Sequence, residues 1–232
     1  MLAAYWLVLI FFAHVPIPQT VRQADLSDKS LHFLAYLVLT FLFWFTFKPE
    51  QKVRWHKATV WLTLCLIIAY GVADELVQSH TGRTCDAMDI AANAAGTLTA
   101  LLILTFLTFW PAALLVVAAV IFGVTNVARK NLNEVLPLAA VMFDLFAYAV
   151  FTFLWIANME RFTRIKAPRI KWLIWAITAP AVFLLIVKTV AAILGRSFNW
   201  SGIIVPSVAI LAVVAATYIR SLLRRDCDCI SH

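Results

Sequence analysis

Charged residues are scarce in this chain of 232 residues, and their scarcity excludes a water-soluble fold. They make up 13% of the sequence while hydrophobic residues make up 63%, against about 25% and about 45–50% in soluble domains. The apolar residues also lack the short alternating pattern of barrel strands and come in unbroken blocks of membrane-spanning length. The sequence therefore predicts an all-α, polytopic membrane helix bundle.

Motifs of the common enzyme classes are missing as well. No Walker loop, GxSxG elbow, HExxH or dinucleotide fingerprint occurs, which removes ATP-driven transport and the common hydrolases from the leading options. Four cysteines are scattered, and only one residue separates Cys227 from Cys229 near the C-terminal end. Because that spacing is unlike the usual zinc or redox spacings, no disulfide framework or zinc site is predicted.

Eight apolar blocks predict about eight transmembrane helices. The first block ends at Pro16 and Pro18 and lacks a basic leader, so we interpret it as a retained span rather than a signal peptide. Trp110 and Pro111 interrupt a run of about 40 residues, too long for one crossing, which predicts a tight turn there. The blocks lie at about residues 2–17, 31–47, 58–73, 87–109, 111–128, 137–157, 172–194 and 202–219.

Lysine and arginine are distributed unevenly between the two sides of this alternating path. Twelve lie on the side of both termini and six on the opposite side. Because cytoplasmic loops carry the excess of these residues, both termini are predicted to be cytoplasmic. The net charge of +7 is then explained by topology and anionic lipid headgroups, and no nucleic-acid partner is expected. Two regions are predicted: residues 1–110, a four-helix domain, and residues 111–232, a second four-helix region with a cytoplasmic tail.

The extracytoplasmic side carries three polar stripes at helical spacing. Residues three or four apart share one helix face, and polar groups at membrane depth usually face the bundle interior or a wet cavity. We therefore expect the three stripes to converge. They consist of Asp28, His32 and Tyr36, of Tyr70, Asp74 and Gln78, and of Asp86, Asp89, Asn93 and Gly96.

The order of these residues resembles the VanZ-like family of membrane proteins. The resemblance covers roughly residues 1–110 and does not extend into the second half. It implies a membrane protein of the cell envelope, since the family's namesake is associated with resistance to the glycopeptide teicoplanin, but it implies no particular chemistry. The motifs are Asp28-Lys29-x-x-His32, Tyr70-Gly71-x-x-Asp74-Glu75-x-x-Gln78 and Arg83-x-x-Asp86-x-x-Asp89-x-x-x-Asn93-x-x-Gly96.

The residue types of this cluster permit three chemistries in one pocket. A histidine with carboxylates suits a divalent cation, and the same groups can act as an acid and base pair. Basic side chains can hold the phosphate or carboxylate of a lipid-linked or peptidoglycan-related ligand. The candidate catalytic residues are His32, Glu75 and Asp89, and the candidate cation ligands are these three with Asp86. The candidate ligand-binding residues are Asp28, Lys29, Asp74, Gln78, Arg83, Asp86 and Asn93.

A purely structural interpretation competes with these chemistries. Asp28 can cap the second span, Asp74 and Gln78 can satisfy loop amides, and Arg83 can pair with Asp86. A non-catalytic scaffold and an ion-coupled transporter are therefore the alternatives to a ligand-binding protein of the bacterial cytoplasmic membrane, and whether the protein is an enzyme stays open.

Three expectations concern the second half and the aromatic residues. Asp144 and Lys188 lie at similar predicted depths, so we expect an ion pair between them. No polar stripe equivalent to those of the first half is expected, which favours a supporting role for residues 111–232. Tryptophans near predicted boundaries, Trp172 among them, are expected to form an aromatic belt with the lipid.

Overall fold

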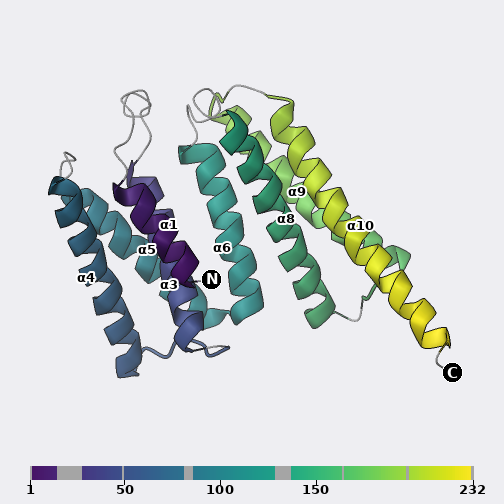
Figure 1. The fold of residues 1–232 in the computed structure, drawn as a ribbon, viewed down its shortest axis with the longest axis horizontal. Helices are drawn as coiled ribbons and strands as arrows, with labels where there is room; N and C mark the ends of the chain where they lie inside the picture. The colour runs from purple at the N-terminus through teal and green to yellow at the C-terminus, as the bar shows by residue number, and fades with distance from the viewer. Residues whose placement is uncertain are drawn as a thin grey trace. The chain divides into compact units, whose positions relative to one another are not determined.

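The computed structural model describes residues 2–14, 28–48, 50–80, 86–128, 137–163, 165–196 and 199–230, and these residues are helical apart from short connections. The chain divides into two compact units, unit 1 (residues 1–131) and unit 2 (residues 132–232). Unit 1 contains α1 (Leu2–His14), α3 (Asp28–Phe47), α4 (Ala58–His80), α5 (Ala87–Phe106), α6 (Phe109–Gly123) and the π-helical turn η1 (Val124–Ala128). Unit 2 contains α8 (Pro137–Phe162), α9 (Ile170–Ile193) and α10 (Ser201–Ile230) (Figure 1).

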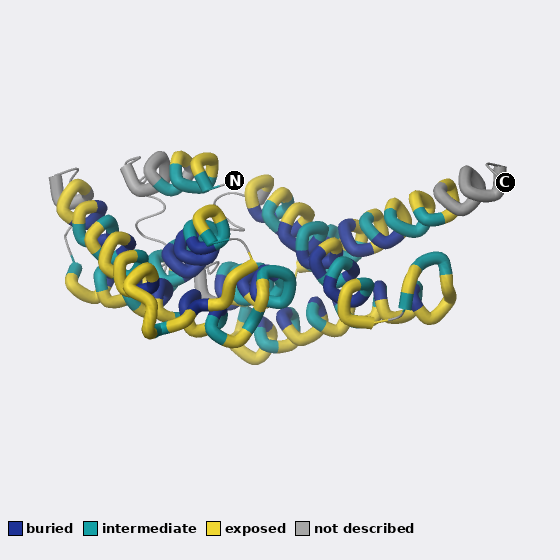
Figure 2. Tube along the Cα trace, turned by 90° about the horizontal axis from the view of Figure 1, so that it is seen from below, coloured by how far each residue is buried: buried dark blue, intermediate teal, exposed yellow. Residues whose placement is uncertain are grey.

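Seven of the described helices, all except α1, are long and apolar enough to cross a membrane. Helix α1 has 13 residues, which at 1.5 Å per residue is about 20 Å and shorter than the roughly 30 Å of a bilayer core. Large apolar side chains such as Leu62, Phe106 and Leu185 are exposed on the helices, while buried residues line the faces turned inward (Figure 2). The predicted all-α membrane helix bundle is confirmed, and the cytoplasmic placement of the termini stays a prediction.

The break between the fourth and fifth apolar blocks lies earlier than predicted. Helix α5 ends at Phe106, and the extended residues Leu107 and Thr108 lead into α6. Pro111 therefore stands in the first turn of α6, where the N–H group that proline lacks would have no partner in the helix. A proline in an apolar run marks a helix start here, not the turn itself.

Helix α3 is the centre of unit 1, packing against α1, α4, α5 and α6. It lies against α5 at Gly96, where an added Cβ would clash with the backbone carbonyl of Phe33. Small residues permit such backbone contact between membrane helices. The phenol of Tyr5 on α1 donates a hydrogen bond to the carbonyl oxygen of Ala35 at 2.9 Å. Together these contacts fix the start of α3 beside the start of α5.

Unit 2 corrects two of the expectations. Helix α8 buries three polar residues at four-residue spacing, Asp144, Tyr148 and Thr152, so this unit does carry a polar stripe. Trp172 does not face lipid but is fully buried, and its indole donates a hydrogen bond to Glu160 Oε1 at 2.9 Å. An acidic partner inside the protein draws the indole N–H inward.

Candidate functional site

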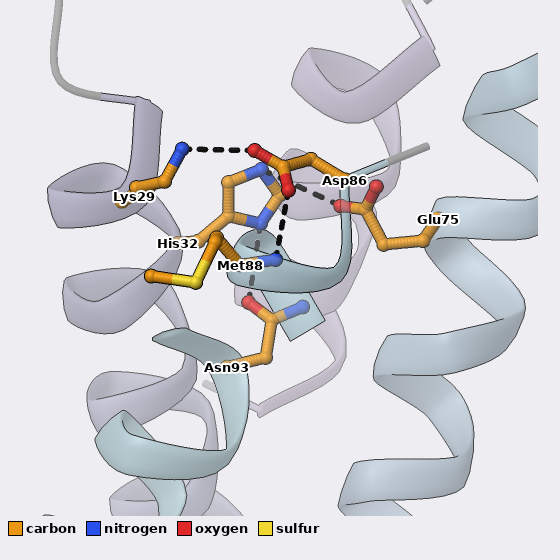
Figure 3. A network of polar contacts seen from close by, with 6 residues as sticks. All are labelled: Lys29, His32, Glu75, Asp86, Met88 and Asn93. Carbon is orange, nitrogen blue, oxygen red and sulfur yellow. Dashed lines mark hydrogen bonds and ion pairs between the residues drawn. The ribbon is translucent and has the colours of Figure 1, made fainter. Parts of the chain in front are cut away.

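Three helix ends build the site at one end of unit 1. Helices α3 and α5 begin there and α4 ends there, as Figure 1 shows. The close α3–α5 contact at Gly96 lies about two turns below the first residue of the site on α5. The side chains of α3, α4 and α5 that point toward one another are drawn in Figure 3.

His32 is held by its Nδ1 atom, which lies 3.1 Å from Asn93 Oδ1 on α5. An amide oxygen can only accept a hydrogen bond, so the Nδ1 atom carries the proton. In its neutral form the ring presents the lone pair of Nε2 on its other side. A histidine oriented in this way by a carbonyl-type oxygen has the arrangement that metal-binding histidines use.

The Nε2 atom of His32 faces the carboxylate of Glu75 on α4. Nε2 and Glu75 Oε1 are 3.6 Å apart, which is longer than a hydrogen bond but close to the separation, about 3 to 3.5 Å, of two ligand atoms bound to one ion at about 2.1 Å. The side chain of Glu75 is only 2% exposed, and its Oε1 atom accepts no hydrogen bond from any residue that the structure describes. Glu75 is thus a buried acceptor with a vacant lone pair.

Asp89 completes a group of three potential ligands. One donor atom from each of His32, Glu75 and Asp89 lies within 4.8 Å of the others, and both carboxylates are buried. When both carboxylates are ionised and the imidazole is neutral, the group holds two buried negative charges, and a positive charge bound among them stabilises this state. Among the described residues this is the set of side chains that can hold a metal ion.

Lys29 and Asp86 form the rim of the site rather than its centre. Lys29 Nζ lies 2.8 Å from Asp86 Oδ2, with both side chains nearly half exposed. Asp86 also caps α5 by accepting a hydrogen bond from the Met88 amide at 2.9 Å. The Lys29 ammonium and the Met88 amide hold the pKa of the Asp86 carboxyl below its usual range. Asp86 is not part of the three-residue group that can hold an ion.

The other predicted site residues are placed only in part. Asp74 is buried one residue before Glu75 on α4, and Asn93 is the partner of His32 described above. The side chains of Asp28 and Gln78 lie outside the described residues, and so does Arg83. The predicted pair of Arg83 with Asp86 therefore stays a prediction.

The floor of the site includes two residues that were not among the candidates. Tyr36 is 1% exposed, and a Cβ added to Gly71 would lie 3.1 Å from the Tyr36 ring and 3.2 Å from Asn93 Nδ2. Gly71 therefore leaves room for both groups. The sequence analysis placed Tyr36 in the first polar stripe and Gly71 in the second motif, but it gave neither residue a role in the site.

Comparison with known proteins gives a family for this part of the chain. Residues 2–110 match the model of the VanZ/LLP1 family, a range that includes α1, α3, α4 and α5 and therefore all three helices of the site. No curated protein and no solved structure matches the chain. The N-terminal part of the chain, residues 2–110, belongs to the VanZ-like family.

Proposed function

We propose that the VanZ-like part of this membrane protein binds an anionic, lipid-linked or peptidoglycan-related ligand of the cell envelope through a divalent cation held by His32, Glu75 and Asp89. The observation that carries the proposal is the meeting of three donor atoms within 4.8 Å of one another. Asn93 supports it by fixing the proton of His32 on Nδ1, which leaves Nε2 for the ion.

Charge favours a cation over a proton at this position. Protonation of His32 would neutralise one of the two carboxylates, whereas a divalent ion neutralises both. The donor set of one imidazole and two carboxylates suits Zn²⁺ or Mn²⁺. Three protein ligands leave at least one coordination position open, which a phosphate or carboxylate oxygen of a ligand can take.

The surroundings of the ion site fit an anionic ligand that arrives from one side of the membrane. Lys29 is exposed at the rim, and its ammonium can contact a phosphate as a point charge. The excess of lysine and arginine on the opposite side supports an extracytoplasmic position of this end in the bacterial cytoplasmic membrane. A link to glycopeptide resistance is suggested by the family's namesake, and membrane lipids are the other expected partners.

The residues below the site favour binding over transport. The hydroxyls of Thr40 and Thr97 donate to carbonyls of their own helices at 2.7 and 2.9 Å, and Leu101 and Leu104 beyond them are fully buried. Within the described part of unit 1 the polar cluster gives way to apolar packing toward the other helix ends. An ion-coupled transporter would need polar groups to continue across the membrane.

The test is cation binding by the purified full-length protein in lipid nanodiscs. Calorimetric titration with Mn²⁺ and with Zn²⁺ is expected to show one site per chain in the wild type. Glu75→Gln and Asp89→Asn keep the side-chain shape but remove a charged ligand, and each should weaken binding by more than about 100-fold. Asp144→Asn, a buried carboxylate of unit 2, is the matched control and should bind like the wild type.

The ligand is tested in the same preparation with a polyprenyl diphosphate. In the wild type, the affinity for the polyprenyl diphosphate is expected to rise at least tenfold when Mn²⁺ is added, whereas in Glu75→Gln it should not rise. In the host cell, Glu75→Gln should alter teicoplanin susceptibility while its yield in membranes stays normal. If the wild type binds no cation, or if both carboxylate variants bind it with unchanged affinity, the proposal is overturned and a non-catalytic scaffold is favoured. Cation-driven flux across vesicles would favour the transporter.

A further inference from the structure

A segment of α8 resembles a segment of α3 in sequence. Residues 32–43 read HFLAYLVLTFLF and residues 144–155 read DLFAYAVFTFLW, with six of twelve positions identical. His32 then corresponds to Asp144, Tyr36 to Tyr148 and Thr40 to Thr152. A segment repeated within one chain is the usual mark of an internally duplicated membrane unit.

The aligned residues have the same surroundings in the two units. Tyr36 is 1% and Tyr148 0% exposed, and the threonine four residues after each donates its hydroxyl to the tyrosine carbonyl at 2.7 Å in both cases. Tyr36 faces Tyr70 of α4 with ring centroids 6.1 Å apart. Tyr148 faces Phe183 of α9 with ring centroids 6.3 Å apart.

These aromatic contacts suggest how the sequences of α4 and α9 align. If Tyr70 corresponds to Phe183, the residue five positions further on is Glu75 in α4 and Lys188 in α9. An offset of 113 residues also relates α5 to α10, where it places each buried residue described in α10 on a buried residue of α5, although residues 89, 100 and 104 of α5 are buried and their counterparts only partly so. Residues 93, 96, 97 and 101 of α5 are buried, and so are residues 206, 209, 210 and 214 of α10. In each unit the first of these helices packs against the third, α3 against α5 and α8 against α10.

The offset also gives Asp89 a counterpart, which is Gly202. A Cβ added to Gly202 would lie 2.9 Å from Lys188 Nζ, so the ammonium occupies the space into which an aspartate side chain would extend. Glu75 and Asp89 are likewise neighbours in unit 1. Lys188 and Gly202 are therefore adjacent in unit 2, as Glu75 and Asp89 are in unit 1, and the sequence repeat places Asp144 at the position of His32 on the first helix of its unit.

We infer that α8, α9 and α10 are a second copy of α3, α4 and α5 in which the Lys188 ammonium, balanced by Asp144, takes the place of the exchangeable cation. Unit 1 has two carboxylates and no fixed positive charge among the three positions, whereas unit 2 has one carboxylate and one ammonium and is neutral without an ion. The role assigned to the ammonium rests on the cation site proposed for unit 1. The chain then binds one cation, in unit 1, and unit 2 binds none.

A stability cycle on the full-length protein in nanodiscs tests the charge pair without using any metal. Lys188→Met leaves the buried Asp144 carboxylate without an opposite charge, and Asp144→Asn does the same to the partly buried Lys188 ammonium. Each substitution is expected to lower the melting temperature by about 6 to 12 °C. The double variant is expected to regain most of that loss. Losses that simply add would overturn the inference, whatever the cation content of unit 1.

A conversion experiment tests the correspondence of the three positions. The triple variant Asp144→His, Lys188→Glu and Gly202→Asp introduces the donor set of unit 1 into unit 2. The number of Mn²⁺ sites per chain, measured by calorimetry, is expected to rise from one to two. If this variant does not fold, Lys188→Glu with Gly202→Asp alone is expected to gain a weaker second site. A folded variant with no gain contradicts the correspondence, and a wild type without any site contradicts the proposed function instead.

Discussion

Units 1 and 2 each contain three corresponding helices, but the charged residues at the corresponding positions differ. In unit 1, His32 and Glu75 face each other at 3.6 Å beside a buried Asp89. In unit 2, the equivalent positions hold Asp144, Lys188 and Gly202, with the lysine ammonium beside the glycine. The first helix packs against the third in both units, so the function assigned to each unit depends on a few charges and not on the fold.

The largest effect is expected where the helices touch. Gly96→Ala would push the α3 and α5 backbones apart because its Cβ clashes with the Phe33 carbonyl, and overpacking of this kind should lower the free energy of unfolding by about 3 kcal/mol. Its counterpart in unit 2 is already an alanine, Ala209, which is buried. Ala209→Gly should therefore cost only about 1 kcal/mol.

Thermal unfolding of the two variants in the same detergent measures the difference. Equal losses would show that the two helix pairs pack alike and that Gly96 has no special role. A large loss in Gly96→Ala with cation affinity reduced in the remaining folded protein is the result that the geometry predicts.

A smaller effect is expected at the residue that orients the histidine. Asn93→Leu removes the acceptor for His32 Nδ1, and loss of such a supporting partner should weaken cation binding by about 10- to 100-fold. Thr97→Val is the matched control on the same face of α5, since the Thr97 hydroxyl donates its hydrogen bond to a carbonyl of its own helix. Calorimetry with Mn²⁺ measures both, and equal affinities in the two variants would remove Asn93 from the site.

Much of this architecture can be predicted from residue spacing. Apolar blocks locate the helices, and polar residues three or four apart place His32, Glu75 and Asp89 on helices that meet. Residue spacing does not reveal how closely α3 and α5 approach each other, because that distance depends on the contact of Gly96 with the Phe33 backbone. It also does not reveal that Lys29 pairs with Asp86. The second copy is hard to recognise because its three counterparts change in charge or lose their side chain.

The smallest effect is expected at the rim. The lowered pKa of Asp86 means that the folded state favours its ionised form, so its contribution to stability is present above the pKa of the unfolded chain, about 3.9, and is lost as the pH falls through the lower folded value. Asp86→Asn should lower the melting temperature at pH 7 by less than about 2 °C because the pair is exposed.

The pH profile of that variant separates the charge from the helix cap. The difference from wild type should shrink as the pH falls below about 4, and it should also shrink in high salt. In a Lys29→Met background the substitution should have less effect at pH 7. A difference that persists at low pH would assign the whole contribution to capping.

The central claim is that His32 Nε2 binds a cation in unit 1, and spin-echo spectroscopy of the Mn²⁺-loaded protein tests it most directly. The expected spectrum shows one imidazole nitrogen coupled to the Mn²⁺ electron spin, which is lost in His32→Gln and retained in Asp144→Asn. A Mn²⁺ signal without imidazole coupling in the wild type, or coupling that survives in His32→Gln, would contradict the account.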